Sequence, residues 1–374
     1  MLGRYRRSLV LIAAVILAAP LLLTVLSGKG ESISEEERRA LTPLPGLPRT
    51  VRDWDHFPRN LDAYLRDHFV PRGAMILAHA VLAHGLFDLS HWVLADGNDD
   101  VLIGPQGRMF YRGNAMIEQS AGLIVRSDAV LETADVVRDV ASALASRGIR
   151  FVFAVVPNSA TIYPEDLPPW ARNTGLPTET DTLLRDLSAR HVLTVDLRAA
   201  LMAAKADGLL YMKHDSHWTP DGSRVGFNAL VEALGRPQWQ IPATALGAPQ
   251  ITRGGDLARM LGVGDAVSEW VRPLTLPAGE VDASSASLLV STMPGGQGPT
   301  VLVLGDSFTR DFLATLVTAN ARRFVWVNHQ ACGFDWHWID RFRPDEVWWI
   351  PTERLELCAP GVRPKDMPPA SAAP

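Results

Sequence analysis

Cysteine is scarce in this sequence. Only two are present among 374 residues, Cys332 and Cys358. Two cysteines are too few for a framework of disulfides, and the paired cysteine and histidine spacings of a zinc-binding motif are missing. An oxidising compartment would permit one bridge between them, and two free thiols are an equally open alternative. The sequence therefore excludes a fold held together by several disulfides.

An excess of positive charge is also missing. The chain has 36 Lys and Arg against 41 Asp and Glu, which gives a formal net charge of −5. Domains that bind nucleic acid usually carry a basic field, so this class of function is not indicated. Apolar residues, in contrast, make up 47% of the chain. That share is enough for a sizeable core and excludes global disorder.

The one long apolar run lies at the N-terminus. Residues 9–26 carry no charge and follow Arg4, Arg6 and Arg7. A run of roughly 17 to 25 apolar residues can span a membrane, and preceding arginines favour a cytoplasmic N-terminus. We expect residues 1–30 to form a signal anchor in the inner membrane, with the rest of the chain on its outer side. A cleaved signal peptide is the alternative, although the cleavage pattern is poor.

Residues 31–127 predict a stalk and a preface to the main domain. A Pro-rich stretch at 42–58 predicts extended chain, and a helical pattern follows at 61–87. Turn signals then alternate with short apolar pieces at 96–114, which is typical of a hairpin.

Residues 128–359 have the pattern of an α/β domain. Helical patterns lie between five apolar segments that predict buried strands. Strands that alternate with helices predict a parallel sheet with helices on both faces. The predicted strands are residues 151–157, 192–197, 301–304, 324–328 and 346–350, and the predicted helices are residues 128–147, 182–191, 224–234, 312–320 and 335–342.

Two segments depart from this alternation. Residues 236–299 are rich in Pro, Gly and Ala, and predict a long insertion with little regular structure. Residues 360–374, PGVRPKDMPPASAAP, predict a disordered tail.

The clearest chemical signal is VLVLGDSF, residues 301–308, where Gly305-Asp306-Ser307 follows an apolar strand. Ligands of an open parallel sheet bind beyond the carboxyl ends of its strands. Ser307 would lie at the start of the next helix, where backbone N–H groups favour an oxyanion. Ser307 is therefore a candidate nucleophile, and an ordinary helix N-cap by Asp306 or Ser307 is the alternative.

A serine nucleophile needs a general base, and the segment YMKHDSHWTPDG at 211–222 offers one. Asp215 and His217 lie two residues apart in a polar loop. The carboxylate can bind one ring nitrogen and leave the other free, which is the arrangement of a Ser-His-Asp triad. A metal site that includes His214 is the alternative, but no third ligand has a telling spacing. We expect neither a metal nor a cofactor.

Together the two motifs resemble the SGNH-hydrolase superfamily, and specifically its periplasmic alginate O-acetyltransferase branch of the AlgJ and AlgX type. Asp-x-His-Trp and Gly-Asp-Ser-Phe are the specific part. Softer matches, which extend over most of the chain after the anchor, include GPQGRMFY, VVPNSATIYPEDLP, GGDLARML and IPTERLE.

The order of the two motifs predicts a rearranged chain. An ordinary SGNH hydrolase begins with its GDS strand and ends with its Asp/His loop, whereas here the loop comes first. The resemblance therefore implies a circularly permuted SGNH-hydrolase-like (flavodoxin-like) fold, in which residues 236–299 join the former ends.

The resemblance also implies roles for residues. Ser307 would be the nucleophile, His217 the base and Asp215 the group that orients it. Gly333 occupies the place of a glycine whose N–H serves the oxyanion hole. The asparagine that commonly lends a side-chain amide has no counterpart in PTERLE, residues 351–356.

Other residues are candidates for the missing donor and for substrate binding. Arg354 and Asn158 are candidate donors, with a surface ion pair as the alternative for Arg354. Trp336 and Trp338 are candidates for stacking on sugar rings, with a place in the core as the alternative. We expect core positions for Trp348 and Trp349, and we expect Trp218 to pack the loop.

The function that the resemblance implies is an O-acetyltransferase in the periplasm, anchored in the inner membrane. Ser307 would carry an acetyl group to hydroxyls of an exopolysaccharide such as alginate. Acetyl-CoA is cytoplasmic, so a multi-pass membrane O-acyltransferase would be the partner that supplies the group. Two alternatives are open: a polysaccharide acetylesterase with the same triad, and a non-catalytic polysaccharide-binding subunit of an export complex. The intact triad argues against the last.

Overall fold

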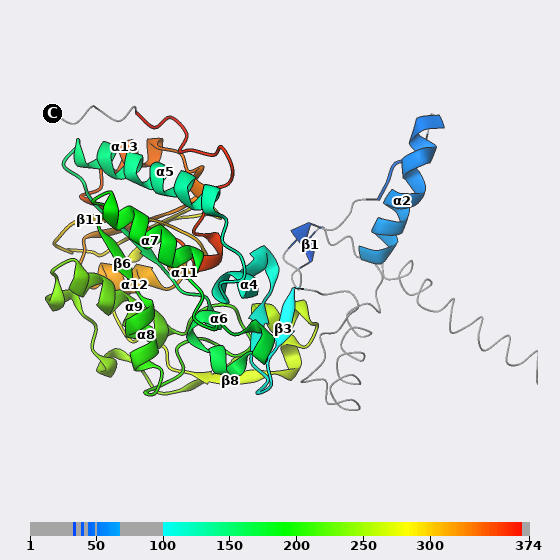
Figure 1. The fold of residues 1–374 in the computed structure, drawn as a ribbon, viewed down its shortest axis with the longest axis horizontal. Helices are drawn as coiled ribbons and strands as arrows, with labels where there is room; N and C mark the ends of the chain where they lie inside the picture. The colour runs from blue at the N-terminus through cyan, green and yellow to red at the C-terminus, as the bar shows by residue number, and fades with distance from the viewer. Residues whose placement is uncertain (1–32, 35–38, 41–43, 49–50, 68–99, 369–374) are drawn as a thin grey trace, which may run out of the picture.

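The computed structural model describes residues 33–34, 39–40, 44–48, 51–67 and 100–368 (Figure 1). The expected anchor at residues 1–30 lies outside this part of the chain, as does most of the helical pattern predicted at 61–87. Among the described residues, no helix combines the length and the apolar character needed to cross a membrane.

A seven-stranded sheet forms the centre of the fold. Its strand order is β6-β5-β13-β11-β12-β10-β9, and the five strands from β6 to β12 are parallel. The last two pairings, β12 with β10 and β10 with β9, are antiparallel, so the sheet is mixed. The strands are β5 (Arg150–Val155), β6 (Thr194–Asp196), β9 (Glu280–Ser284), β10 (Leu288–Thr292), β11 (Thr300–Gly305), β12 (Arg323–Asn328) and β13 (Glu346–Ile350).

All five predicted strands are present, and their order explains the reversed motifs. Numbered from β11, the parallel strands stand side by side in the order 2-1-3-4-5, which is the flavodoxin-like arrangement. The chain nevertheless builds β5 and β6 first and β11, β12 and β13 last. The predicted circular permutation therefore agrees with the observed topology.

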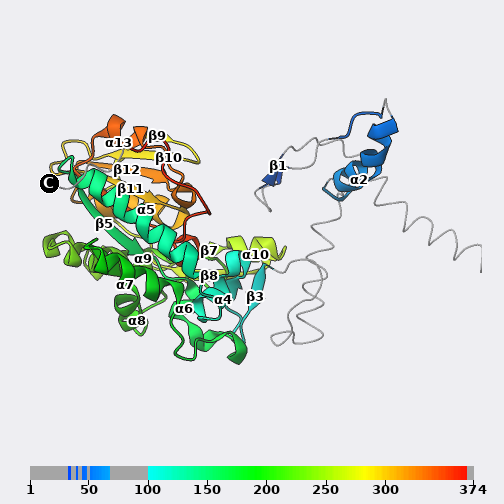
Figure 2. The same cartoon turned by 45° about the horizontal axis from the view of Figure 1, so that its top comes forward.

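Both faces of the sheet are buried because successive side chains of a strand point to opposite faces. On β11, Val301 and Val303 pack into one hydrophobic cluster, and Leu302 and Leu304 into the other. The first cluster includes helices α8, α9 and α12, and the second includes α5, α7 and α13 (Figures 1 and 2). Their bounds are α5 (Ser127–Ala145), α7 (Glu179–Ala189), α8 (Arg198–Ala204), α9 (Pro220–Ala233), α12 (Leu313–Thr318) and α13 (His337–Phe342).

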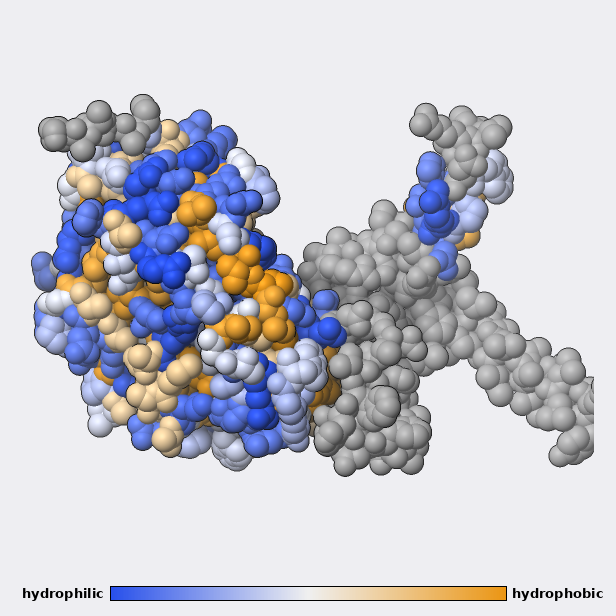
Figure 3. Space-filling model, viewed as in Figure 1, coloured by the Kyte–Doolittle hydropathy of each residue, from blue (hydrophilic) through white to orange (hydrophobic). Residues whose placement is uncertain are grey.

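The covering helices are amphipathic. In α5, Val130, Val137 and Leu144 have no exposed surface, whereas Leu131 on another side of the helix is 47% exposed. Figure 3 shows hydrophilic side chains over much of the outer surface, with smaller apolar areas between them. This pattern is expected for helices that bury one side against a sheet.

The expectation of little regular structure in residues 236–299 is wrong. This segment contains β7 (Gln250–Arg253) paired with β8 (Ser268–Val271), the short helix α10 (Asp256–Met260) between them, and the strands β9 and β10. Each element has only four or five residues. Such pieces are too short for a clear hydrophobic period. The strands are stabilised by pairing, β7 with β8, β9 with β10, and β10 also with β12 of the central sheet.

Two expectations near the N-terminus have different outcomes. The hairpin is confirmed as β3 (Val101–Ile103) paired with β4 (Met109–Tyr111).

The expectation of extended chain at 42–58 is wrong for residues 51–58. These residues belong to helix α2 (Val51–Asp67), although Pro58 lies inside it. Trp54, Phe57 and Leu61 recur at helical spacing, and the rings of the first two are 5.8 Å apart. A short pair, β1 (Ile33–Ser34) and β2 (Arg39–Ala40), completes the described N-terminal elements.

The expected disorder of the tail at 360–374 is wrong for residues 360–368. Residues 360–368 are placed, and Lys365 exchanges hydrogen bonds of 2.9 Å with the backbone of Phe334 and Trp336. An ion pair of Arg363 with Asp139 and the packing of Met367 on a hydrophobic cluster also hold the segment. All these partners are distant in sequence, which explains why composition did not reveal them. Residues 369–374 lie outside the described chain.

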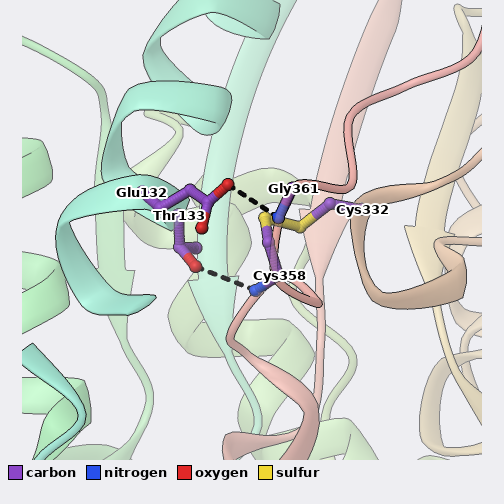
Figure 4. Close-up of a disulfide and its surroundings, with 5 residues drawn as sticks. All are labelled: Glu132, Thr133, Cys332, Cys358 and Gly361. Carbon is purple, nitrogen blue, oxygen red and sulfur yellow. Dashed lines mark hydrogen bonds between the residues drawn. A yellow bond between two sulfur atoms is a disulfide. The ribbon is translucent and has the colours of Figure 1, made fainter. Parts of the chain in front are cut away.

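Cys332 and Cys358 form a disulfide, which decides between the two open alternatives (Figure 4). The bond ties the loop after β12 to the segment after β13. Helix α5 supports it, because Thr133 Oγ1 accepts a hydrogen bond from the N–H of Cys358 at 2.8 Å and Glu132 Oε1 accepts one from the N–H of Gly361 at 2.9 Å.

Candidate active site

Ser307 stands at the carboxyl end of the central strand β11 and is the first residue of helix α11 (Ser307–Arg310). The turn before it requires glycine. A Cβ on Gly305 would lie 2.0 Å from Thr309 Oγ1 and 3.1 Å from the carbonyl oxygen of Ile350. Any larger residue would push the turn away from β13, so Gly305 allows the close approach that sets the position of Ser307.

Asp306 fixes the same turn from the other side. Its Oδ1 accepts a hydrogen bond from the N–H of Phe308 at 3.0 Å and caps α11. Its Oδ2 accepts hydrogen bonds from the N–H and the hydroxyl of Thr352, just beyond β13. The N-cap that the sequence offered as an alternative to catalysis is thus present on Asp306, and it leaves Ser307 Oγ available.

The loop that contains His217 is folded onto the serine turn. The indole N–H of Trp218 donates to the carbonyl oxygen of Phe308 at 3.0 Å, and the Trp218 side chain is 1% exposed. A bridge between Tyr211 and Trp218 closes the base of the loop. Trp218 therefore packs the loop, as expected.

The three candidate catalytic residues lie in one hydrogen-bonded line. His217 Nε2 is 2.8 Å from Ser307 Oγ, and His217 Nδ1 is 2.7 Å from Asp215 Oδ1. With the proton on Nδ1, the ring donates to Asp215, and Nε2 accepts the hydroxyl proton of Ser307. Ser307 is exposed, whereas the side chain of His217 is only 16% exposed and that of Asp215 only 13%. The nucleophile is therefore open to solvent, whereas the carboxylate that orients the base is covered by protein.

Asp215 carries a negative charge in this arrangement. Burial by itself would raise the pKa of the carboxyl, but the hydrogen bonds from the His217 ring and from backbone N–H groups outweigh it and lower the pKa below its ordinary range. The two backbone donors are His217, at 3.0 Å, and Asp256, at 2.8 Å. The carboxylate therefore stays ionised and keeps the ring in the required tautomer.

Two acidic residues of the 236–299 insertion hold the loop that carries this pair. Glu269 on β8 accepts hydrogen bonds from the backbone N–H of Lys213 at 2.8 Å and of His214 at 3.2 Å. Asp256 Oδ1 accepts one from the backbone N–H of Ser216 at 2.7 Å, and Oδ2 accepts one from the Ser216 hydroxyl at 2.6 Å. The insertion thus fixes the backbone on both sides of Asp215.

Gly255 allows this close contact. It has a φ of +142°, and a Cβ there would lie 2.1 Å from the carbonyl oxygen of His214. The same carbonyl accepts a hydrogen bond from the N–H of Ala258 at 3.1 Å. Only glycine fits between α10 and the loop, both in backbone conformation and in space.

For the metal site that the sequence left open, the structure brings Asp256, and not His214, next to Asp215 and His217. Asp215, His217 and Asp256 present atoms within 4.8 Å of one another. His214, in contrast, points its Nδ1 toward Glu269 Oε1, at 3.4 Å. The oxygens of Asp215 and Asp256 already accept hydrogen bonds from backbone N–H groups, a serine hydroxyl and the His217 ring. The set therefore fits an orienting hydrogen-bond network better than a metal cage.

Gly333 is not placed as an oxyanion donor. It follows the short 3-10 helix η8 (Gln330–Cys332), and its N–H donates to the carbonyl oxygen of Gln330 at 3.0 Å. The sequence located the loop after β12 correctly, but the loop turns back on itself beside the disulfide and uses this N–H internally.

Asn158 is also engaged elsewhere. Its side chain has no exposed surface, and Nδ2 donates to Ser120 Oγ at 3.1 Å. Its backbone N–H donates to Glu353 Oε2 at 2.7 Å. The residue belongs to a buried polar network behind the strand ends rather than to the surface around Ser307.

Arg354 is the candidate donor that packs on Phe308, the residue after the serine. It lies in η9 (Glu353–Leu355) after β13, with its guanidinium carbon 4.9 Å from the ring centre of Phe308 and 5.4 Å from that of Tyr111. Its Nη1 is buried and has no hydrogen-bond partner among the described residues. A buried, unpaired guanidinium N–H next to the serine turn is suited to bind an oxygen of a substrate.

The tryptophans are divided between core and surface. Trp336 has no exposed surface and packs against Phe334, so the sugar-stacking alternative is wrong for it and the core alternative holds. Trp338 packs on the same hydrophobic cluster and stacks on Phe342. Trp348 and Trp349 are each 1% exposed, as expected for core residues.

Sequence reasoning missed Asp256, Glu269 and Thr352. A signal for Asp256 was present, because the pair Gly254-Gly255 interrupts the chain directly before the short helix that Asp256 begins. Glu269 and Thr352 carry no local signal, since their partners lie 56 and 46 residues away in sequence.

Comparison with known proteins identifies the family of the chain. Residues 101–350 match the model of a family described as SGNH hydrolase-like domain, acetyltransferase AlgX. The probable alginate O-acetylase AlgJ of Pseudomonas putida is 35% identical over 109 residues, 28% of this chain and 27% of that protein. The protein of the same name in Pseudomonas aeruginosa is 28% identical over 222 residues, 56% of this chain and 52% of that protein.

The chain thus spans about half, or less, of the length of these relatives. Among solved structures, Bacillus cereus PatB1 with a sulfonyl adduct is similar, with a TM-score of 0.52 and 13% identity. The match covers 69% of this chain and 96% of PatB1, and it shows a shared fold. Because the family match extends over most of the chain, this protein belongs to the family of SGNH hydrolase-like acetyltransferases typified by AlgX.

Proposed function

We propose that this chain is an O-acetyltransferase that moves an acetyl group through Ser307 to hydroxyl groups of an exopolysaccharide such as alginate. The observation that carries the proposal is the line from Ser307 Oγ through His217 to Asp215, with distances of 2.8 and 2.7 Å, in a member of an acetyltransferase family.

In the first half-reaction, His217 Nε2 takes the hydroxyl proton as Ser307 Oγ attacks the acetyl carbonyl carbon of the donor. The bond between that carbon and the donor oxygen breaks, and His217 returns the proton to the leaving oxygen. Ser307 is then an acetyl ester. The Asp215 carboxylate stabilises the imidazolium that forms in between.

The second half-reaction repeats these steps with a sugar hydroxyl as the nucleophile. His217 takes its proton, the sugar oxygen bonds to the acetyl carbon, and Ser307 Oγ leaves and regains a proton. Two groups are suited to stabilise the oxyanion. The N–H of Ser307 opens α11 and has no acceptor inside the helix, and Arg354 Nη1 is buried without a partner among the described residues.

An acetylesterase with the same residues is a second candidate function. Ser307 is exposed, so water as well as a sugar hydroxyl can reach an acetyl group on it. The two functions share the first half-reaction and differ only in the acceptor of the second.

We further propose that the domain works in the periplasm. The disulfide between Cys332 and Cys358 supports an oxidising compartment, and the apolar run at 9–26 supports an anchor in the inner membrane. In such a location the acetyl group must come across the membrane, which makes a multi-pass membrane O-acyltransferase the proposed donor partner.

The test is to incubate the full-length chain with a chromogenic acetyl ester, with and without deacetylated alginate oligosaccharides, and to weigh enzyme and sugars by intact-mass analysis. An acetyl adduct on Ser307 together with acetylated sugar is expected. Free acetate without acetylated sugar would identify an esterase instead. Ser307→Ala, His217→Ala and Asp215→Ala should each abolish turnover while the circular dichroism spectrum is unchanged, and three active variants would refute the triad.

A further inference from the structure

Asp256 approaches His217 from the side opposite the serine. Its Oδ2 lies 3.5 Å from His217 Nδ1, the nitrogen that is 2.7 Å from Asp215. Two carboxylates from different parts of the chain therefore face one ring nitrogen. Asp256 also donates its backbone N–H to the second oxygen of Asp215 at 2.8 Å, which fixes the first carboxylate with respect to the second.

The side chain of Asp256 is itself held in place. Its Oδ1 accepts hydrogen bonds from the backbone N–H of Ser216 and of Leu257, each at 2.7 Å. Its Oδ2 accepts the Ser216 hydroxyl at 2.6 Å. Four of its contacts therefore involve Asp215, Ser216 or His217, three consecutive residues of one loop. This concentration is more than a helix start in an insertion needs for its own stability.

The charge environment of His217 makes Asp256 important for the reaction. Two carboxylates face the ring, Asp215 on its own loop and Asp256 on α10. The other charged and titratable groups nearby have other neighbours: His214 lies 3.4 Å from Glu269 on β8, and Arg354 in η9 packs on Phe308, whose ring also packs on that of His217. Asp215 and Asp256 are the carboxylates within 4 Å of the ring in the described part of the chain. Negative charges at this distance stabilise the imidazolium that forms when His217 takes a proton from an attacking hydroxyl.

We propose that Asp256 is a positioning residue that acts through His217: it fixes the loop between Asp215 and His217, and its charge shares with Asp215 the stabilisation of the imidazolium. The inference rests on the proposed acyl-transfer function. It gives the insertion at residues 236–299 a part in catalysis, in addition to its part as the connection between the two halves of the permuted fold.

The first test is Asp256→Asn. The amide keeps the size of the side chain and the Oδ1 acceptor for Ser216, but removes the charge next to His217. Without that charge the imidazolium is less stable, so the acid limb of the profile of kcat/KM against pH should move to lower pH by about half a unit to one unit. The plateau value should fall by about tenfold, because the protonated ring is less stabilised in the transition state.

The second test, Ser216→Ala, has the opposite expected sign. It removes the hydroxyl that donates to Asp256 Oδ2, so more of the negative charge of that oxygen acts on His217. The acid limb should then move to higher pH by a few tenths of a unit. A purely structural role predicts no such reversal between the two variants. Asp265→Asn is the matched control, because it removes an exposed carboxylate of the same insertion and should leave the midpoint unchanged.

The titration of His217 should also be followed by NMR, with its ring resonance assigned by its loss in His217→Gln. Midpoints that stay at the wild-type value in both variants, or that move in the same direction, would overturn the inference. If Asp256→Asn is not recovered folded, Ser216→Ala decides alone: an upward shift supports the inference, and an unchanged midpoint overturns it.

The NMR readout separates this inference from the proposed function. Opposite shifts in a chain that forms no acetyl adduct would retain the coupling between Asp256 and His217 but refute the function, and with it the part of Asp256 in acyl transfer. A chain that acetylates sugars while neither variant moves the His217 midpoint would retain the function and refute the inference.

Discussion

Asp306 and Thr352 are joined by two hydrogen bonds, because one carboxylate oxygen of Asp306 accepts both the N–H and the hydroxyl of Thr352. The second oxygen of Asp306 caps the helix that Ser307 begins. Asp306 is 5% and Thr352 0% exposed, so water does not replace either contact. The nucleophile is thus positioned by a tie between the ends of two neighbouring strands, β11 and β13.

Replacing Thr352 tests this tie. Thr352→Val keeps the shape of the side chain and the backbone N–H but removes the hydroxyl, which leaves a buried carboxylate oxygen with one donor fewer. We expect the free energy of unfolding to fall by about 1–3 kcal/mol and kcat to fall several-fold, because the turn at Ser307 loosens. Thr352→Ser retains the hydroxyl and should preserve kcat. Urea unfolding and ester hydrolysis measure both effects, and equal kcat values for the Val and Ser variants would contradict the prediction.

Arg354 is predicted to act on the transition state rather than on the fold. Its Nη1 is buried and unpaired among the described residues, and it faces the rings of Phe308 and Tyr111. Arg354→Met should lower kcat by about 100-fold, the usual loss for one oxyanion donor, with little change in thermal stability. Arg354→Lys keeps the charge but not the planar fork, and should recover only part of the rate. A Met variant with wild-type kcat would remove Arg354 from the site.

The sheet and the catalytic loop could be predicted because their signals are local. Five runs of apolar residues between turn signals gave the five parallel strands. The Gly-Asp-Ser and Asp-x-His motifs follow strands whose carboxyl ends meet at one edge. The permuted order was predictable from the order of the motifs along the chain.

The remaining features depend on contacts that sequence does not reveal. Glu269 lies on a strand of four residues, and its partners Lys213 and His214 are more than 50 residues away. Trp336 could be a surface or a core residue until its neighbours in the fold were known. Gly333 lies in the expected loop, but the direction of its N–H depends on the turn at Gln330, where φ is +49°.

The disulfide is predicted to stabilise the fold substantially. It joins Cys332 and Cys358 across a separation of 26 residues. Closing a loop of this length should contribute about 3 kcal/mol by restricting the unfolded chain. Replacing both cysteines by Ser should lower the free energy of unfolding by that amount, and dithiothreitol should lower wild-type stability similarly. The reductant should not affect the double variant. A wild-type chain whose unfolding midpoint is insensitive to dithiothreitol would contradict the prediction.

Glu356 is predicted to make stability depend on pH. The side chain is 2% exposed, and both of its oxygens share one donor, the hydroxyl of Thr180, at 3.0 and 2.9 Å. Burial raises the pKa of Glu356 well above its ordinary value of 4.5, and the nearby Glu353 raises it further. Because the folded pKa exceeds the unfolded one, this group contributes stability that is fully present below about pH 4.5. That contribution is lost as the pH rises through the folded pKa.

Glu356→Gln isolates this effect. The amide keeps an acceptor for Thr180 and cannot ionise, so at neutral pH the variant should be more stable than the wild type by roughly 1–3 kcal/mol. Below about pH 4.5 the difference should vanish, since the wild-type carboxyl is then protonated in both states. Glu280→Gln, on the exposed strand β9, is the control and should change stability little at either pH. Thermal unfolding at several pH values measures the difference. A variant that is less stable than the wild type at neutral pH would contradict the prediction, because it would show that Glu356 is ionised and paired in the fold.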